Sequence, residues 1–162
     1  MTTSSITPGA ATRWRATRGV PRPRRARGGC VTVGSATGVY VIEIELAEPA
    51  TVSAGKLGAL DFPAGAYLYV GSARRALPSR VARHMRREKP LRWHIDYLTT
   101  RDRVTAVRTW PHAPGRECAI ARSLAAHLPA VSRFGCSDCH CRSHLFRGSL
   151  ASVGQVIRPG SA

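Results

Sequence analysis

The chain has 162 residues, with 25 Lys or Arg against 9 Asp or Glu and a formal net charge of +16. This length allows one domain with a tail, or two very small domains, and a hydrophobic fraction of 43% excludes wholesale disorder. No stretch approaches the roughly 18 consecutive apolar residues of a membrane-spanning helix. A pI near 11.4 predicts attraction to polyanions, either nucleic acids or anionic membrane surfaces.

The first 34 residues differ in composition from the rest. They contain seven arginines and no acidic residue, and Pro and Gly interrupt the arginine-rich run over 22–29. Because few large apolar residues offset the entropy of ordering, we predict a disordered basic arm over 1–34. Two interpretations stay open: a tail that grips phosphates, or a weakly constrained extension that begins at a start codon placed too early.

The cysteines bear on the compartment. Five are present, at positions 30, 118, 136, 139 and 141, and three of them lie within six residues. That spacing is too tight for a disulfide framework joining distant elements. The N-terminal stretch also lacks the apolar segment of a secretory signal. We therefore expect a cytoplasmic protein with free or metal-bound thiols.

Strands are predicted first along the folded part of the chain. Over 38–46 apolar residues alternate with others, which is typical of a strand with one buried face. The following features are a short strand around 51–57, a turn at 61–65, and a strand over 66–71 that places Tyr67 and Tyr69 on one face.

Helices follow the strands. Pro78 suits the first turn of a helix that runs to about Glu88, with Leu77, Val81 and Met85 as its apolar stripe. Strands followed by helices predict a small α+β domain over 35–150. The later elements are a helix over 92–99, an edge strand over 103–110, a helix over 116–128, a loop rich in Cys and His, and an unpatterned tail over 151–162.

The segment 74–92 carries eight Lys or Arg against one Glu. Like charges at i and i+4 on a helix repel one another unless an anion compensates them. We predict a surface that binds nucleic-acid phosphates, with a solvated basic face as the alternative. The residues assigned to it are Arg74, Arg75, Arg83 and Arg87, together with His94 beyond the segment.

Glu117 lies in register with the apolar residues Ile120 and Leu124 of the last predicted helix. A carboxylate on such a stripe is costly unless it is paired or binds a metal ion. The alternative is a first-turn acid that the helix dipole favours.

Two tripeptides resemble the paired strand motifs that name the GIY-YIG endonuclease superfamily: Gly38-Val39-Tyr40 and Tyr69-Val70-Gly71. The later Ser-His-Leu-Phe stretch is most similar to the compact Uri-type branch. The resemblance covers about residues 38–147. On the next helix and beyond, the matching positions are Arg80 and His84, four residues apart, then His94, and finally Glu117, which corresponds to the single acidic metal ligand of the family.

The resemblance implies a small, mainly antiparallel three-stranded sheet flanked by helices, and a metal-dependent endonuclease that cuts phosphodiester bonds in DNA. Glu117 would hold Mg²⁺ or Mn²⁺, and Arg80 would bind phosphate oxygens. Our hypothesis makes Tyr40 the general base, with Tyr69 orienting water or substrate and His84 either relaying a proton or contacting phosphate. Because tyrosine has a pKa near 10, Tyr40 is expected to need a cation nearby that lowers it.

The chain departs from the family pattern in three ways. The stretch between Tyr40 and Tyr69 exceeds a tight hairpin, which implies an inserted strand or loop. Arg80 lies one residue further from the second tyrosine than is usual. The chain contains no asparagine, so the Asn used by some relatives is missing.

Four soft donors also lie within nine residues: Cys136, Cys139, Cys141 and His144. Zinc prefers four such ligands in a tetrahedron, yet structural sites usually draw them from two separated segments. The alternatives are a Zn²⁺ site and a thiol-rich loop packed near the active face. Cys30 and Cys118 are too remote in sequence to assign.

Two other classes of function compete with the nuclease. One is a nucleic-acid-binding module that keeps the fold and the basic face but does not cut, and the other is a ribosome-associated structural protein. Binding alone needs neither Glu117 nor Tyr40, whereas hydrolysis needs both. No predicted element is suited to reading base edges, so we expect low sequence specificity, and no membrane partner.

Overall fold

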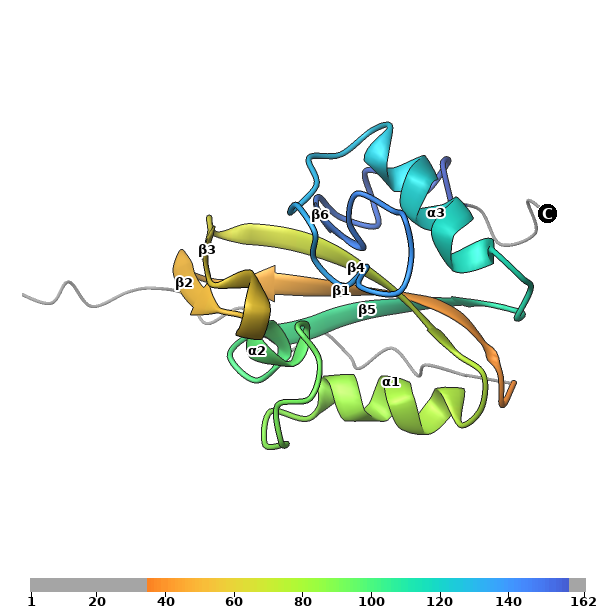
Figure 1. Cartoon of the computed structure of the whole chain (residues 1–162), viewed down its shortest axis with the longest axis horizontal. Helices are drawn as coiled ribbons and strands as arrows, with labels where there is room; N and C mark the ends of the chain where they lie inside the picture. Colours follow the sequence, from red (N-terminus) through yellow and green to blue (C-terminus); the bar gives the residue numbers. More distant parts are fainter. Residues whose placement is uncertain (1–34, 158–162) are drawn as a thin grey trace, which may run out of the picture.

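A four-stranded antiparallel sheet lies at the centre of this computed structural model, which describes residues 35–157 (Figure 1). Helices pack around the sheet, so the predicted α+β class is confirmed. The predicted basic arm, residues 1–34, lies outside the described part. In the order β5-β1-β4-β6, the strands are β5 (Arg103–Trp110), β1 (Gly38–Leu46), β4 (Gly65–Ala73) and β6 (Leu145–Arg147).

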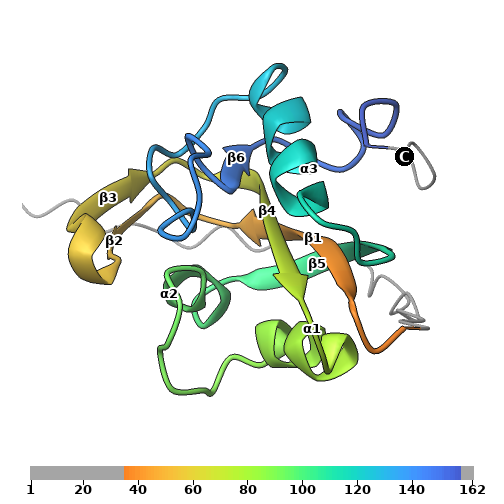
Figure 2. The same ribbon diagram turned by 45° about the vertical axis from the view of Figure 1, so that its right-hand side comes forward.

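The strand β1 is buried on both faces, whereas its alternation predicted one buried face. Ile42 and Ile44 cluster with residues of the helices α1 (Leu77–Met85) and α2 (Asp96–Thr99). Val39 and Val41 cluster with residues of α3 (Arg116–Ala125). Figure 2 shows α1 and α3 on opposite sides of the sheet. The nearly continuous apolar run in β1 is typical of a strand covered on both sides.

The helices are shorter than predicted. Met85 is 51% exposed and His84 is 1% exposed, so His84 takes the inward place that the predicted stripe gave to Met85. A spacing of i, i+4 and i+7 puts His84 on one face with Leu77 and Val81. The helices are α1 (Leu77–Met85), α2 (Asp96–Thr99) and α3 (Arg116–Ala125).

A second, two-stranded sheet fills the long connection between β1 and β4. It consists of β2 (Ala50–Ser53) and β3 (Ala59–Phe62), joined through the 3-10 turn η1 (Gly55–Leu57). The strand predicted to reach residue 57 therefore ends at 53, and the expected turn at 61–65 begins inside β3. Phe62 anchors this sheet, since its buried ring meets Tyr67 of β4 edge-on.

The C-terminal part of the chain is more ordered than predicted. The strand β6 pairs with the free edge of β4, which raises the expected three-stranded sheet to four strands. Residues 151–157 were expected to begin an unpatterned tail, but Val153 and Ile157 are buried and join Leu150 in the cluster under α3. The Leu150 N–H donates to the carboxylate of Glu43, which fixes this segment on the sheet. Within 35–157 no helix is both long and apolar enough to cross a membrane.

Candidate active site and the neighbouring cysteine cluster

The predicted catalytic side chains converge beside one end of β4. The strand β6 pairs with β4 only as far as Tyr69, so 71–73 have β1 as their single strand neighbour. Groups from both faces of the sheet meet at this open edge, two of them from α1 and one from α3. The converging residues are Tyr40, Tyr69, Arg80, His84 and Glu117.

Tyr40 and His84 form a buried hydrogen-bonded pair. The Tyr40 hydroxyl lies 2.8 Å from Nε2 of His84, and the two residues are 2% and 1% exposed. The phenol ring lies across Gly71, where an added Cβ would come within 2.5 Å of it. The glycine of the second tripeptide therefore makes room for the tyrosine of the first.

Arg80 is held in place by two contacts. Its Nη1 donates to the carbonyl oxygen of Ser72 at 3.0 Å, and its guanidinium carbon lies 4.8 Å from the centre of the Trp93 ring. Arg80 is also close enough to Tyr40 for its charge to oppose the rise in the pKa of the phenol. The hydroxyl of Tyr40 therefore has His84 as its hydrogen-bond partner, with the positive charge of Arg80 nearby.

Glu117 reaches the edge of β4 from the first turn of α3. Oε2 accepts a short hydrogen bond from the Ser72 hydroxyl, and Oε1 lies 3.3 Å from Nδ1 of His144. Burial opposes the charge on this carboxyl, but His144 and Ser72 outweigh it and lower its pKa. The side chain is 29% exposed, so an ionised carboxylate is within reach of solvent. The sequence assigned no role to Ser72, although it directly follows the second tripeptide motif.

Burial changes the expected acid–base chemistry. It raises the pKa of Tyr40 well above its ordinary value; Tyr69 adds to this increase and Arg80 only partly opposes it. Burial likewise raises the pKa of Tyr69. Arg80 does lower the pKa of Tyr40, as the hypothesis requires, but burial outweighs this effect. At neutral pH Tyr40 is therefore a phenol. Burial, helped by Lys89, lowers the pKa of His84 to about 4, so that His84 is a neutral acceptor.

The free energy of unfolding should fall as the pH drops from about 6.5 towards 4. Unfolded His84 takes up a proton near pH 6.5 and folded His84 only near 4, so acid favours the unfolded chain across this window. At 1.36 kcal/mol per pKa unit, the loss is about 3 kcal/mol. Urea unfolding between pH 4 and 7 measures it. His84→Gln should flatten this part of the profile, whereas His112→Gln, at an exposed position, should leave it unchanged.

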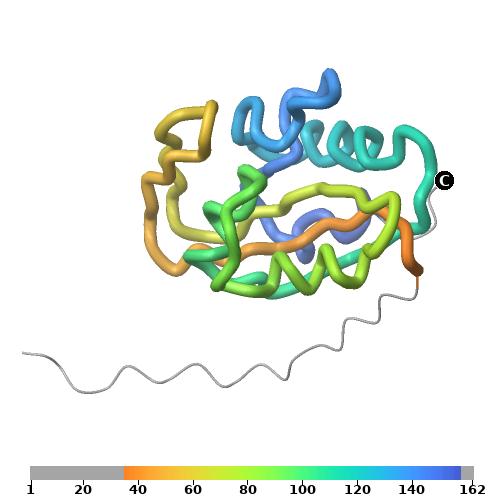
Figure 3. Tube along the Cα trace, turned by 60° about the horizontal axis from the view of Figure 1, so that its bottom comes forward, coloured from red at the N-terminus to blue at the C-terminus, as the bar shows by residue number. Residues whose placement is uncertain are grey.

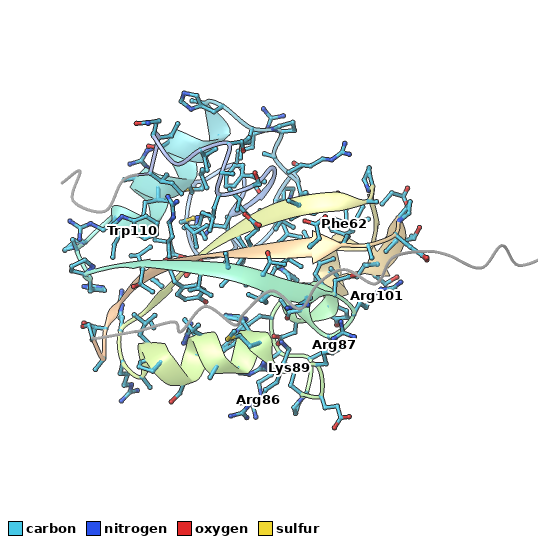
Figure 4. All side chains as sticks on the ribbon, turned by 180° about the vertical axis from the view of Figure 1, so that it is seen from behind. Phe62, Arg86, Arg87, Lys89, Arg101 and Trp110 are labelled. Atoms are coloured by element: carbon cyan, nitrogen blue, oxygen red, sulfur yellow. The ribbon has the colours of Figure 1, made fainter. Side chains whose placement is uncertain are left out.

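The basic surface is only partly as predicted. Arg83 is not free for phosphate, because both of its terminal nitrogens donate to the buried carboxylate of Asp96 at 3.0 Å. Arg74, Arg75 and Arg87 are exposed. Figure 4 shows Arg86 and Arg87 together beyond the end of α1.

His94 lies away from that surface. Its ring packs 5.7 Å from Phe134, whose ring in turn lies 6.5 Å from Tyr69. The ring of Phe134 therefore lies between His94 and the converging residues. A role of His94 in phosphate binding stays a prediction.

The sulfur and imidazole groups gather on the α3 side of the same edge. The loop between α3 and β6 lies beside α3 (Figure 3) and brings three of the predicted donors together with Cys118, one of the two cysteines left unassigned. Cys136 is not part of this group. The ligand atoms of Cys118, Cys139, Cys141 and His144 all lie within 4.8 Å of one another.

The comparisons with known proteins give one match. No curated protein and no solved structure matches the chain. Residues 39–158 match the profile of one protein family, from the second residue of β1 past the buried Ile157. This match spans most of the chain and all of the residues gathered at the edge of β4. The chain therefore belongs to the family described as the domain of unknown function DUF123.

Proposed function

We propose that this protein is a divalent-metal-dependent endonuclease that hydrolyses phosphodiester bonds in DNA with low sequence specificity. The observation that carries the proposal is the meeting of a carboxylate, a guanidinium and a phenol–imidazole pair at one open strand edge. These groups come from β1, α1 and α3, so the arrangement is not a by-product of a single helix or loop.

Glu117 is suited to hold Mg²⁺ or Mn²⁺. Its carboxylate is ionised and part-exposed. It accepts a hydrogen bond from Ser72 and lies 3.3 Å from Nδ1 of His144, which leaves lone pairs for a metal ion. Mg²⁺ is bound in many proteins through one or two carboxylates and otherwise keeps its waters or takes substrate phosphate oxygens. Bound there, such an ion supplies positive charge to a phosphate that must accept more negative charge.

Arg80 and the Tyr40–His84 pair supply the remaining chemistry. The donors of Arg80 that Ser72 does not use would bind phosphate oxygens, in an orientation that Trp93 restrains. The attacking water would pass its proton to the Tyr40 oxygen as the Tyr40 proton moves to Nε2 of His84. This relay needs no tyrosinate, which agrees with the raised pKa of Tyr40.

The charge of the molecule favours a nucleic acid as the substrate. Exposed arginines follow β4 directly, at Arg74 and Arg75, and follow α1, at Arg86 and Arg87. These arginines lie just before and just after α1 in the chain. They would contact the phosphates on either side of a bound scissile bond. A non-catalytic nucleic-acid-binding module is the second candidate, since these arginines would serve it equally well.

Glu117→Gln should lower the rate of DNA cleavage at least about 100-fold while leaving DNA binding intact. The substitution keeps the shape of the side chain and removes the charge that would hold a metal ion. The assay incubates purified protein with plasmid, branched and single-stranded DNA, in Mg²⁺ or in EDTA. The wild-type protein should cleave DNA in the presence of Mg²⁺ and should not cleave it in EDTA.

Glu48→Gln is the matched control, because Glu48 is exposed beyond the opposite end of β1 and its loss changes the net charge equally. Its cleavage rate should equal that of the wild type. Equal cleavage by wild type and Glu117→Gln would contradict the proposal and point to a contaminating nuclease. DNA binding without cleavage of any substrate would favour the non-catalytic module.

A further inference from the structure

We propose that Cys118, Cys139, Cys141 and His144 bind one Zn²⁺ ion, which joins the Cys/His loop to α3. The four ligand atoms all lie within 4.8 Å of one another. In a tetrahedral site with Zn–S of about 2.3 Å and Zn–N of about 2.0 Å, ligand atoms are separated by about 3.5–3.8 Å. Sγ of Cys139 and Nε2 of His144 already lie 3.4 Å apart, so small movements complete the tetrahedron.

The donor set selects the metal. Three thiols and one imidazole match the Cys₃His sites of zinc and contain none of the oxygen donors that Mg²⁺ requires. All four cysteines within 35–157 are free thiols, so the three in the cluster are available as ligands. This site therefore differs in chemistry from the metal position proposed at Glu117.

The arrangement of the ligands fits a structural role. One comes from the first turn of α3, and the other three come from a loop that is built of turns between α3 and β6. Two separated segments are the usual source of structural zinc ligands. An ion here would fix a loop that has few hydrogen bonds of its own to α3, and would hold His144 next to β4, where its carbonyl oxygen accepts from the Val70 N–H at 2.9 Å.

Glu117 provides an independent sign of metal binding. The imidazole of His144 is 2% exposed; its Nε2 faces the thiols, and its Nδ1 lies 3.3 Å from Oε1 of Glu117. Histidine ligands of zinc usually present their second nitrogen to a carboxylate, which sets the tautomer and the ring orientation. Glu117 would then position His144, whatever the outcome of the nuclease assays.

Zinc analysis of the full-length protein tests the site directly. Elemental analysis should give one zinc per chain. Replacement by Co²⁺ should produce thiolate charge-transfer absorption and the strong visible bands of a tetrahedral ion. Absence of both from the wild-type protein would overturn the proposal, and neither measurement depends on DNA cleavage.

Cys118→Ser should weaken zinc binding by more than the roughly 10- to 100-fold that loss of an outer-shell partner costs. The matched control is Cys136→Ser, which changes a thiol of the same loop outside the cluster and should keep one zinc. If Cys136→Ser loses zinc and Cys118→Ser retains it, the ligand set is wrong. Cys118→His guards against a failure to fold: it should retain Co²⁺ with weaker thiolate charge-transfer absorption, and unchanged absorption would exclude Cys118 as a ligand.

Discussion

Replacing Asp96 by Asn is expected to lower the free energy of unfolding by about 3–5 kcal/mol, a large part of the stability of a small domain. Asp96 is completely buried, and its carboxylate accepts two hydrogen bonds from Arg83 and lies 3.8 Å from Nζ of Lys89. It also accepts from the backbone N–H groups of Arg92 and Trp93. Without its charge, two cations would remain beside a buried site with no anion to balance them.

Urea unfolding at neutral pH measures this loss as a lower midpoint at an unchanged slope. Asp102→Asn is the control, because it makes the same chemical change at a partly exposed position a short distance along the chain. It should unfold within about 0.5 kcal/mol of the wild type. If the Asp96→Asn protein were as stable as the control, Arg83 and Lys89 would be solvated by water and would not depend on the carboxylate.

The Asp96 cluster also connects stability to the candidate site. Lys89 donates to the carbonyl oxygens of Arg83 and His84 at the end of α1, so the cluster closes the last turn of the helix that carries His84. The guanidinium groups of Arg83 and Arg80 both pack against the ring of Trp93, which links the cluster to Arg80. Asp96 is therefore expected to influence cleavage indirectly, through the placement of α1.

The sequence predicted the long strands better than the short ones. The bounds of β1 and β5 match the predicted 38–46 and 103–110, because long runs of apolar and β-branched residues specify a strand locally. The short strands β3 and β6 were missed, since runs of three or four residues become strands through their partners. Met85 was predicted to face the core, but His84 does so for a related reason. The apolar stripe of a helix tells which residues share a face but not how the helix is rotated against the sheet.

The candidate site was likewise predicted only in part, because some of its members are brought together by tertiary packing. The order of the motifs placed Tyr40, Arg80 and Glu117 in one site. In the structure Arg80 and Glu117 both contact Ser72, and the ring of Tyr40 packs on the adjacent Gly71. Cys118 was missed as a cluster member because its proximity to the Cys/His loop arises only from the packing of α3. The sequence pointed to Arg80 as a cation that lowers the pKa of Tyr40, but not to the burial that outweighs it.

Tyr40→Phe is expected to lower the rate of DNA cleavage at saturating substrate by about 100-fold or more, the usual effect of removing a general acid–base group. The substitution deletes only the hydroxyl, which lies 2.8 Å from Nε2 of His84. The ring stays and still packs against Gly71. DNA binding should therefore be unchanged, and the loss should appear in the rate of the chemical step measured in single-turnover assays.

Tyr67→Phe is the matched control, because it removes a hydroxyl from the same sheet face at the opposite end of β4. That hydroxyl donates to the carbonyl oxygen of Pro63 at 2.8 Å and contacts none of the converging residues. Its loss should cost about 1 kcal/mol of stability and leave the cleavage rate within about twofold. If Tyr40→Phe cleaved DNA as fast as Tyr67→Phe, the phenol would be a packing residue alone. The proton of the attacking water would then have to leave without passing through the buried Tyr40–His84 pair.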